Sequence, residues 1–223
     1  MYRYETHLHT APVSRCASAG VRETLEYYKE LGYDGVFITN HFLDGNINIS
    51  SKVPYEERLD FYYSAYHEGV EIGKELGLKV FSAVELSYMG IDFLVYGLDQ
   101  EWYRNHPEIM DMPKKQELAY LMEQGALGIH AHPFREDQHI DYIRLYPRQV
   151  HGVETVNASR REDVNDMARL YADHYGLLHF AGSDNHIGRG MKHLAGMCCE
   201  RPITDEWDFV KAVMNGEMEI FRI

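Results

Sequence analysis

The chain has 223 residues, of which 45% are hydrophobic and 26% are charged, and its formal net charge is −13. This length and composition are typical of a globular protein, so we expect residues 1–223 to form a single domain. The negative charge argues against a surface that binds long nucleic acids or anionic membranes. A small anionic substrate stays possible, because a metal cluster reverses the local field.

The three cysteines, Cys16, Cys198 and Cys199, form no C-x-x-C pair. They therefore indicate neither a disulfide framework nor a cysteine-based zinc site. The N-terminus does not have the basic and apolar regions of a signal peptide, and no apolar run reaches membrane-spanning length. We expect a cytoplasmic protein.

Strand and helix signals alternate along the chain. Apolar runs with β-branched residues predict strands, and amphipathic runs with Pro at their start or Gly at their end predict helices. In chain order these are a strand at 2–9, a helix at 21–32, strands at 34–40, 78–86 and 90–99 with a helix at 54–77 between the first two, a helix at 114–125, strands at 126–134 and 151–157, a helix at 161–176, a strand at 177–186, a helix at 204–216 and a last strand at 219–223.

This alternation predicts βα units and a mostly parallel sheet. About seven such units in a chain of this length favour a closed barrel over an open sheet. A barrel of βα units carries its active site at the C-terminal ends of its strands.

Histidine, aspartate and glutamate recur where the predicted strands end. His7 and His9 close the first strand, on which residues two apart share a face. The same residue types at or near later strand ends are His41, Glu85, Asp92, His130, His132, Glu154, Asp184 and His186. Imidazoles and carboxylates buried together must be neutralised or bound, and transition metals prefer these ligands. The pattern therefore predicts a metal cluster at the strand ends.

Three members of this set have a second interpretation. His130 is either a ligand or a packed core histidine. Glu154 is either a ligand or an acceptor that orients one. Asp92 lies early in its strand, away from the end where the other ligands are expected.

The motifs that carry this pattern follow one another over most of the chain. They are H-L-H-T (7–10), N-H (40–41), V-E-L (84–86), H-P-F-R (132–135), V-E-T-V-N (153–157) and G-S-D-N-H (182–186). In this order they resemble the PHP family, the polymerase and histidinol phosphatase domain. The resemblance implies a distorted (β/α)7 barrel that carries two to three divalent metal ions, commonly zinc, manganese or iron.

The resemblance also implies roles for individual residues. A first metal ion would be held by His7, His9, Glu85 and Asp184, and a second by His41 and His186. Glu85 would bridge to a third ion, which His132 also binds. Many members have a further histidine for this third ion, and this chain has Asp92 at the matching position, which keeps an oxygen ligand.

The stretch after the first motif departs from the family pattern. Where that pattern reads S-D-G and the acid helps to bind the second metal, this chain reads A-P-V-S-R-C. Ser14 takes the place of the acid, and serine is a poor ligand. Cys16 is either a thiolate ligand or a structural or free cysteine. Arg15 is a candidate substrate contact.

A cluster of metal ions fits hydrolysis of a small phosphate ester, such as a phosphomonoester or a nucleotide, by an activated water. The sequence has no G-x-S-x-G motif and no P-loop, so a serine hydrolase or an NTPase has no support. Arg135 and Arg160 are the first candidates to bind the phosphoryl oxygens, followed by Arg161 and Arg189. His186 is a candidate proton donor to the leaving alcohol as well as a ligand.

Two other functions fit parts of the pattern. Amidohydrolase-type C–N hydrolases also open their barrel with H-x-H and have a late Asp, but no lysine stands at a mid-chain strand end here. A PHP module that binds metal without catalysis is the second alternative. Trp102 and Tyr103, in a predicted loop, would either stack on a substrate base or pack within the protein.

Overall fold

The computed structural model describes residues 1–138 and 140–223, and His139 lies outside the described residues. In this part of the chain, strands hydrogen-bond into one sheet in the order β7-β6-β5-β4-β3-β2-β1-β8-β9. The strands are β1 (Tyr2–Glu5), β2 (Gly35–Ile38), β3 (Lys79–Tyr88), β4 (Ile91–Tyr96), β5 (Leu127–Ala131), β6 (Gly152–Asn157), β7 (Leu178–Gly182), β8 (Ala195–Cys199) and β9 (Glu219–Arg222).

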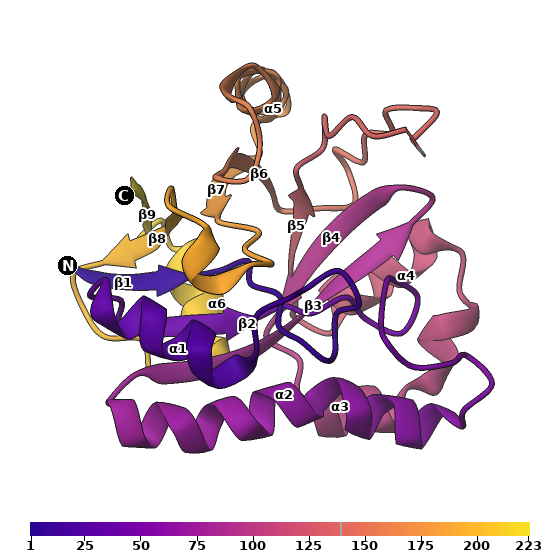
Figure 1. Cartoon of the computed structure of the whole chain (residues 1–223). Helices are drawn as coiled ribbons and strands as arrows, with labels where there is room; N and C mark the ends of the chain where they lie inside the picture. The colour runs from indigo at the N-terminus through magenta and orange to yellow at the C-terminus, as the bar shows by residue number, and fades with distance from the viewer. Residues whose placement is uncertain (139) are drawn as a thin grey trace.

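The helices pack around this sheet (Figure 1). They are α1 (Val21–Glu30), α2 (Tyr55–Leu76), α3 (Gln100–Asn105), α4 (Lys114–Glu123), α5 (Glu162–Tyr175) and α6 (Glu206–Met214), with short 3-10 helices η1 (Pro107–Asp111) and η2 (Gly188–Gly190). The long predicted helix at 54–77 is α2, and it ends at Gly77, whose φ of 64° is the left-handed conformation that glycine adopts readily.

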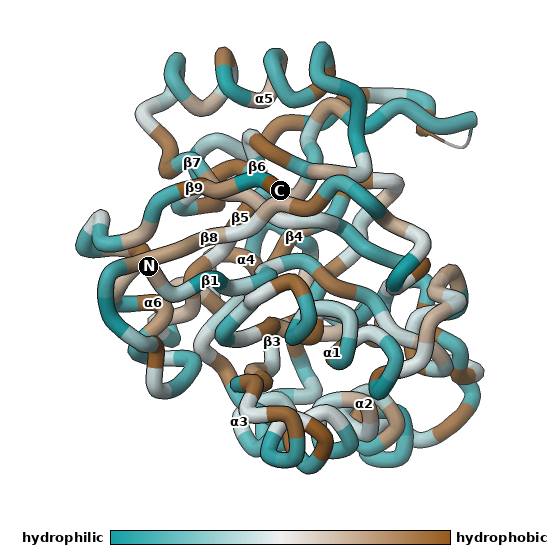
Figure 2. Tube along the Cα trace, turned by 60° about the vertical axis from the view of Figure 1, so that its left-hand side comes forward, coloured by the Kyte–Doolittle hydropathy of each residue, from teal (hydrophilic) through white to brown (hydrophobic). Residues whose placement is uncertain are grey.

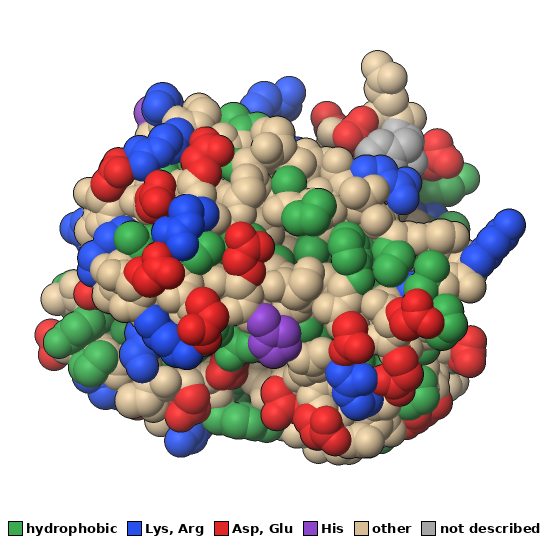
Figure 3. Space-filling model, turned by 60° about the horizontal axis from the view of Figure 1, so that its bottom comes forward, with side chains coloured by type: hydrophobic (Ala, Val, Ile, Leu, Met, Phe, Trp, Pro, Cys, Tyr) green, Lys and Arg blue, Asp and Glu red, His purple; other side chains and the backbone are tan. Residues whose placement is uncertain are grey.

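The two sides of the molecule are covered differently. Figures 1 and 2 show α2 and α3 along one side and α5 along the opposite side. Hydrophilic and hydrophobic residues alternate along α5 (Figure 2), and its buried Ala168 and Tyr171 pack with Val153 of β6. The face seen in Figure 3 carries acidic and basic side chains interspersed.

The sheet curls into a nearly closed barrel. The segments that follow β1 and β7 run parallel, because Asp184 N donates to His7 O (2.8 Å) and His9 N donates to Asn185 O (3.0 Å). Inside, the ring of Phe37 on β2 lies 5.3 Å from that of Tyr96 on β4. The ring of Phe209 on α6 lies 4.4 Å from Phe37, so α6 fills one end of the barrel.

The prediction of a mostly parallel sheet is wrong in the middle of the barrel. β3 pairs antiparallel with β4, and β4 pairs antiparallel with β5. The turn between β3 and β4 is Met89–Gly90, with φ of 51° and 86°. A two-residue turn with both φ positive makes a hairpin, and it is far too short for the crossover that parallel strands need. A mixed α/β barrel-like sheet is therefore present, and the regular βα repeat is interrupted at this hairpin.

Two other differences affect the ends of the barrel. The first strand ends at Glu5 and not at residue 9, so His7 and His9 lie in the segment just after it. β8, which we did not predict, pairs antiparallel with both β1 and β9. Its sequence, A-G-M-C-C, contains no β-branched residue and so does not have the usual strand composition. No helix in the described part of the chain is long and apolar enough to cross a membrane.

Candidate metal centre

The predicted ligands converge at one end of the barrel. They come from the segments after β1, β2, β5 and β7 and from within β3 and β4. A cavity of about 470 Å³ opens onto them and is lined by His41, Glu85, Asp92, His132, Arg135, Arg160, Asp184 and His186 among others. His7 and His9 lie fully buried behind this lining. The structure therefore brings together the eight residues expected as metal ligands.

Asp92 reaches the site because β4 is antiparallel to both of its neighbours, β3 and β5. The start of an antiparallel strand lies at the end of the barrel where its neighbours finish. Asp92 pairs in register with Ser87, near the end of β3, and its Oδ1 accepts a hydrogen bond from Ser87 Oγ (2.7 Å). Because β3 and β4 form a hairpin, a residue early in β4 lies at the same end of the barrel as the other ligands.

Glu85 stands at the centre of the cluster. Its Oε2 lies 2.6 Å from Nδ1 of His41, and its Oε1 lies 3.1 Å from Nε2 of His7. Nε2 of His9 is 3.4 Å from Oε2, and Nε2 of His132 is 3.5 Å from Oε1. Four imidazoles therefore surround one carboxylate that is only 1% exposed.

Asp184 forms the opposite wall. Its Oδ1 lies 3.5 Å from Nε2 of His7 and 3.3 Å from Nδ1 of His186. Its Oδ2 accepts hydrogen bonds from Arg160 Nη2 (2.8 Å) and Ser159 Oγ (3.0 Å). The φ angles of Asp184 and His132 are 55° and 27°. Non-glycine residues are uncommon at positive φ and are found at functional sites, where the surrounding structure holds them.

The residues fit a cluster of metal ions. Four groups have ligand atoms within 4.8 Å of one another: His7 with Glu85 and His132, His7 with His9 and Asp184, His41 with Glu85 and Asp92, and His9 with His41 and His186. Within residues 1–138 and 140–223, neither oxygen of Glu85 has a hydrogen-bond partner of good geometry, nor has Oδ2 of Asp92. A bound cation would satisfy buried carboxylate oxygens that lack well-aligned hydrogen-bond donors.

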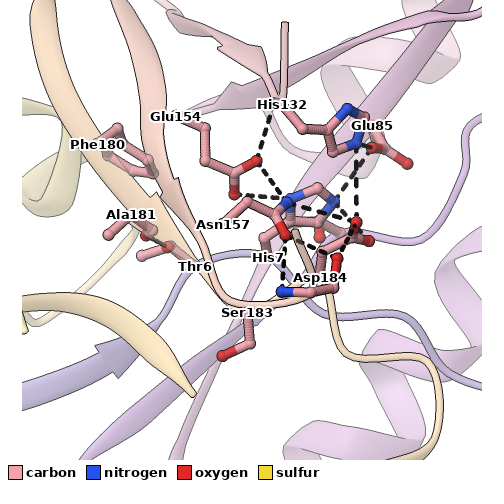
Figure 4. Close-up of polar contacts among 12 residues, drawn as sticks. Thr6, His7, Glu85, His132, Glu154, Asn157, Phe180, Ala181, Ser183 and Asp184 are labelled. Atoms are coloured by element: carbon pink, nitrogen blue, oxygen red, sulfur yellow. Dashed lines mark hydrogen bonds and ion pairs between the residues drawn. The ribbon is translucent and has the colours of Figure 1, made fainter. Parts of the chain in front are cut away.

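A second layer of polar groups holds these side chains in place. Figure 4 shows the ring of His7 between Glu154 on one side and Glu85 and Asp184 on the other. Nδ1 of His7 lies 2.9 Å from Oε1 of Glu154, which leaves its Nε2 facing the cluster. Oε2 of Glu154 accepts from Asn157 Nδ2 (2.8 Å) and from the backbone N–H of His132 (3.1 Å). Glu154 is therefore an orienting acceptor in this structure.

The electrostatics of the cluster differ between its members. Burial lowers the pKa of His9 well below its usual range, and the nearby charge of His186 adds to this. A neutral imidazole is the form that binds metal. Burial would also lower the pKa of His7, but Glu154, Asp184 and Glu85 raise it well above the usual range. Burial would raise the pKa of Glu85, but His41, His9 and His7 hold it well below normal.

The arginine candidates separate into two groups. Arg135 and Arg160 line the cavity, and Nη2 of Arg135 lies 3.2 Å from Oδ2 of Asp92. Arg161 pairs with Asp163 on the surface, and Arg189 pairs with Glu30. Of these four arginines, only Arg135 and Arg160 therefore face the cluster.

The segment after the first motif is also held firmly. Oγ of Ser14 lies 3.0 Å from Nδ1 of His9, donates to Asn40 Oδ1 (2.8 Å) and accepts from the backbone N–H of His41 (3.1 Å). Ser14 thus orients His9 from behind. Arg15 donates to Ile47 O (3.1 Å). Cys16 lines the cavity. Burial would raise the pKa of its thiol, but His186 and His41 lower it to about 6.

Other candidates pack within the protein. His130 is fully buried and its ring stacks on Phe93 at 4.9 Å. Burial lowers the pKa of His130 to about 3, so it is a neutral core histidine. Tyr103 is fully buried in α3, with Trp102 packed edge-on against it at 5.1 Å.

The sequence analysis missed Glu5. Oε1 of this fully buried carboxylate accepts the backbone N–H groups of Thr6, His7 and Ser183, each at 2.9 Å. Tyr28 Oη donates to Oε2 (2.8 Å). Glu5 therefore ties the segment that carries His7 to the segment that carries Asp184. A charged residue two positions before the H-x-H motif, in a strand with a buried end, was the available signal.

A second missed network supports Asp92. Nζ of the buried Lys114 lies 2.6 Å from Oδ2 of Asp44 and 2.6 Å from Oε2 of Glu117. Oδ1 of Asp44 accepts from the backbone N–H of Ser87 (3.2 Å), whose hydroxyl holds Asp92. Asp44, Ser87 and Lys114 lie far apart in the sequence, and no motif links them.

One segment of the chain and the fold as a whole resemble known proteins. A family model described as PHP-associated matches residues 162–218. The fold is similar to a two-domain protein of Bacteroides vulgatus that contains a predicted PHP-like metal-dependent phosphoesterase, with a TM-score of 0.69 and 14% identity over 99% of this chain and 64% of that one. These findings support the resemblance of this chain to the PHP family.

Two further structures have a similar fold. A predicted metal-dependent phosphoesterase of Bifidobacterium adolescentis has a TM-score of 0.57 and 14% identity over 83% of this chain and 88% of that one. An amidohydrolase of Chromobacterium violaceum has a TM-score of 0.57 and 13% identity over 99% and 98%. At these identities the likeness concerns the fold. The sequence matches no curated protein.

Proposed function

We propose that residues 1–223 form one metal-dependent phosphoesterase domain that hydrolyses a small phosphate ester. The observation that carries this proposal is Glu85. Its buried carboxylate has two oxygens without good hydrogen bonds and is surrounded by four imidazoles at the base of an open cavity. The PHP-like neighbours support a metal-dependent hydrolase, and the cavity volume of about 470 Å³ is in the range of small-molecule sites.

The ligand assignment follows the groups of neighbouring side chains. His7, His9, Glu85 and Asp184 would hold the first ion. His41 and His186 would hold the second. Glu85, His132 and Asp92 would hold the third, with Asp92 as its second oxygen ligand. With divalent ions such as zinc, manganese or iron in these places, the site would supply a water nucleophile of lowered pKa and stabilise charge on phosphoryl oxygens.

The chain's own residues would orient the substrate and donate protons. The guanidinium groups of Arg135 and Arg160 line the cavity beside Asp92 and Asp184, where they would donate to phosphoryl oxygens. His186 has a side chain that is 23% exposed, more than the other imidazoles of the cluster, and lies at the cavity. It would protonate the leaving alcohol when it is not fully engaged as a ligand.

The second candidate is a C–N hydrolase. It is kept because an amidohydrolase shares the fold along almost the whole chain. Both reactions use an activated water, so the positions of the ligands do not separate them. The arginines at the cavity favour the phosphate ester, since planar guanidinium groups match phosphate oxygens.

The test is product release by the purified protein loaded in turn with manganese, zinc and iron. Phosphate released from phosphomonoesters or nucleotides, and lost in His9→Ala, supports the proposal. Ammonia or amine released from amides in place of phosphate would establish the C–N hydrolase. Metal bound without either product would indicate a binding module.

A matched pair of arginine variants sharpens this test. Arg160→Lys removes the planar guanidinium at the cavity, and we expect kcat/KM to fall by about tenfold or more, equivalent to about 1.4 kcal/mol. Arg161→Lys changes the neighbouring surface arginine, whose side chain is 72% exposed, and should leave kcat/KM unchanged. Equal effects in both variants would contradict a role for Arg160 in binding phosphate.

A further inference from the structure

One corner of the cluster is made of imidazoles. Ligand nitrogens of His9, His41 and His186 lie within 4.8 Å of one another. The ring of His9 lies 4.1 Å from that of His186 and 4.5 Å from that of His41. Glu85 and Asp184, the nearest carboxylates, belong to the other groups of ligands. This group of three ligands contains no carboxylate, although Oε2 of Glu85 lies 2.6 Å from Nδ1 of His41.

Cys16 faces this corner. It lines the cavity together with His41 and His186. The backbone on either side is fixed, because Arg15 N donates to Asn46 O (2.9 Å) and Ala17 N donates to Ser14 O (3.1 Å). The thiol is therefore held at the cavity wall by its own loop.

The other candidate in this loop is already engaged. Oγ of Ser14 interacts with the His9 ring, Asn40 and the backbone of His41, and Ser14 is not among the residues that line the cavity. A second observation points to a cation here. Glu85, which lies 2.6 Å from His41, is 1% exposed and neither of its oxygens has a good hydrogen bond within residues 1–138 and 140–223.

We propose that Cys16 supplies a thiolate ligand to the metal ion held by His41 and His186. The inference rests on the proposed metal cluster and adds a sulfur ligand to it. Binding forms a metal–sulfur bond and releases the thiol proton to solvent. Thiolate is a soft ligand, so this position selects zinc, cobalt or ferrous iron over manganese and magnesium.

Cobalt substitution tests the proposal by spectroscopy and not by activity. The metal-free protein is titrated with Co²⁺, and the near-ultraviolet sulfur-to-cobalt charge-transfer band is recorded together with the number of ions bound. We expect the band in the wild type and its loss in Cys16→Ser. Affinity for one ion should fall by at least about tenfold, the lower end of what loss of an orienting partner already costs.

Two variants serve as controls. Cys198→Ser changes a cysteine that is 5% exposed in β8 and pairs with Arg3 of β1, and it should keep the band. Cys16→Asp restores an anionic ligand and should restore the number of ions bound without the band. Wild-type protein that binds cobalt without this band would overturn the sulfur ligand and leave the cluster standing. Protein that binds no cobalt would overturn both proposals.

Alkylation provides a measurement that does not depend on a folded variant. Iodoacetamide should modify the exposed Cys16 in the metal-free wild type, and zinc should slow this by at least tenfold, or about 1.4 kcal/mol of protection. Cys198 and Cys199 are buried and serve as internal references in the same peptide analysis. An unchanged rate at Cys16 in zinc-loaded protein would contradict the proposal.

Discussion

The interior of the barrel and its open end are built from the same strands but are stabilised in opposite ways. On β3, Phe81, Ala83 and Glu85 share one face, and the first two pack inside the barrel while Glu85 enters the metal cluster. On β4 the series is Tyr96, Leu94 and Asp92, in the reverse direction of the chain. On each strand, a shift of two residues along one face therefore leads from a side chain in the hydrophobic core to a side chain in the metal cluster.

The difference shows which part of the molecule carries stability and which carries chemistry. Inside, rings of Phe37, Tyr96 and Phe209 contact one another, and the hydroxyl of Tyr96 donates to Thr6 O (2.6 Å). At the open end, the carboxylates of Glu85 and Asp92 are buried without complete hydrogen bonding. Burial of such groups costs free energy unless a ligand satisfies them, so this end is built for binding.

The largest effect is expected from Glu85→Gln. The amide removes the charge shared by the surrounding imidazoles, so we expect loss of at least one bound metal ion and a fall in kcat of at least about a thousandfold, or about 4 kcal/mol. Metal analysis and phosphate release measure the two quantities. A variant that keeps both the ions and the activity would show that Glu85 is not the centre of the site.

Phe37→Ala tests the interior. Truncating this fully buried ring should lower the free energy of unfolding by about 3–5 kcal/mol. Urea unfolding measures the change, and metal affinity of the folded fraction should stay the same. Leu170→Ala, at a side chain that is 70% exposed on α5, should change the free energy by less than about 0.5 kcal/mol. Similar losses in both variants would contradict the division between core and surface.

Glu154→Gln tests the layer between the two regions. Loss of the carboxylate that holds Nδ1 of His7 should weaken metal affinity by about 10–100-fold while the fold is kept. Asp173→Asn provides a matched control, because Asp173 forms a similar contact with His179 on the surface (3.0 Å). Isothermal titration with zinc compares the variants. Equal affinities in Glu154→Gln and the wild type would exclude an orienting role.

The smallest effect concerns pH and the Lys114 network. Burial raises the pKa of Glu117 from 4.5 to about 7, although Lys114 opposes this. Between these values the native state holds more protons than the unfolded state, so the free energy of unfolding falls as pH rises from about 4.5 to 7. Glu117→Gln should flatten this slope by up to about 1.4 kcal/mol per pH unit.

Urea unfolding at pH 5 and pH 7 measures the slope. Glu123→Gln, at an exposed position on the same helix, is the control and should follow the wild type. A slope that is as steep in Glu117→Gln as in the wild type would place the pH dependence elsewhere in the molecule.

Much of the site could be predicted from local sequence. A recognisable strand stands beside each group of candidates: the H-x-H pair, the later acids and histidines, and the two arginines. The ends of the strands in one barrel must converge, so these side chains are expected together. Cys16 and Glu154 were left with two interpretations, because a side chain's role depends on what it faces. The structure places Glu154 behind His7 and Cys16 at the cavity.

The sequence by itself determined most of the elements, though not β8 or α3, and the chemistry of the ligands, because hydrophobic periodicity and residue type are local properties. Only the tertiary structure decided the direction of β4, the pairing of the segments after β1 and β7, and the contacts of Glu5 with Ser183. Strand pairing and buried hydrogen bonds join residues up to 199 positions apart in the chain. Such contacts depend on which surfaces meet in the folded barrel, and no local pattern records that choice.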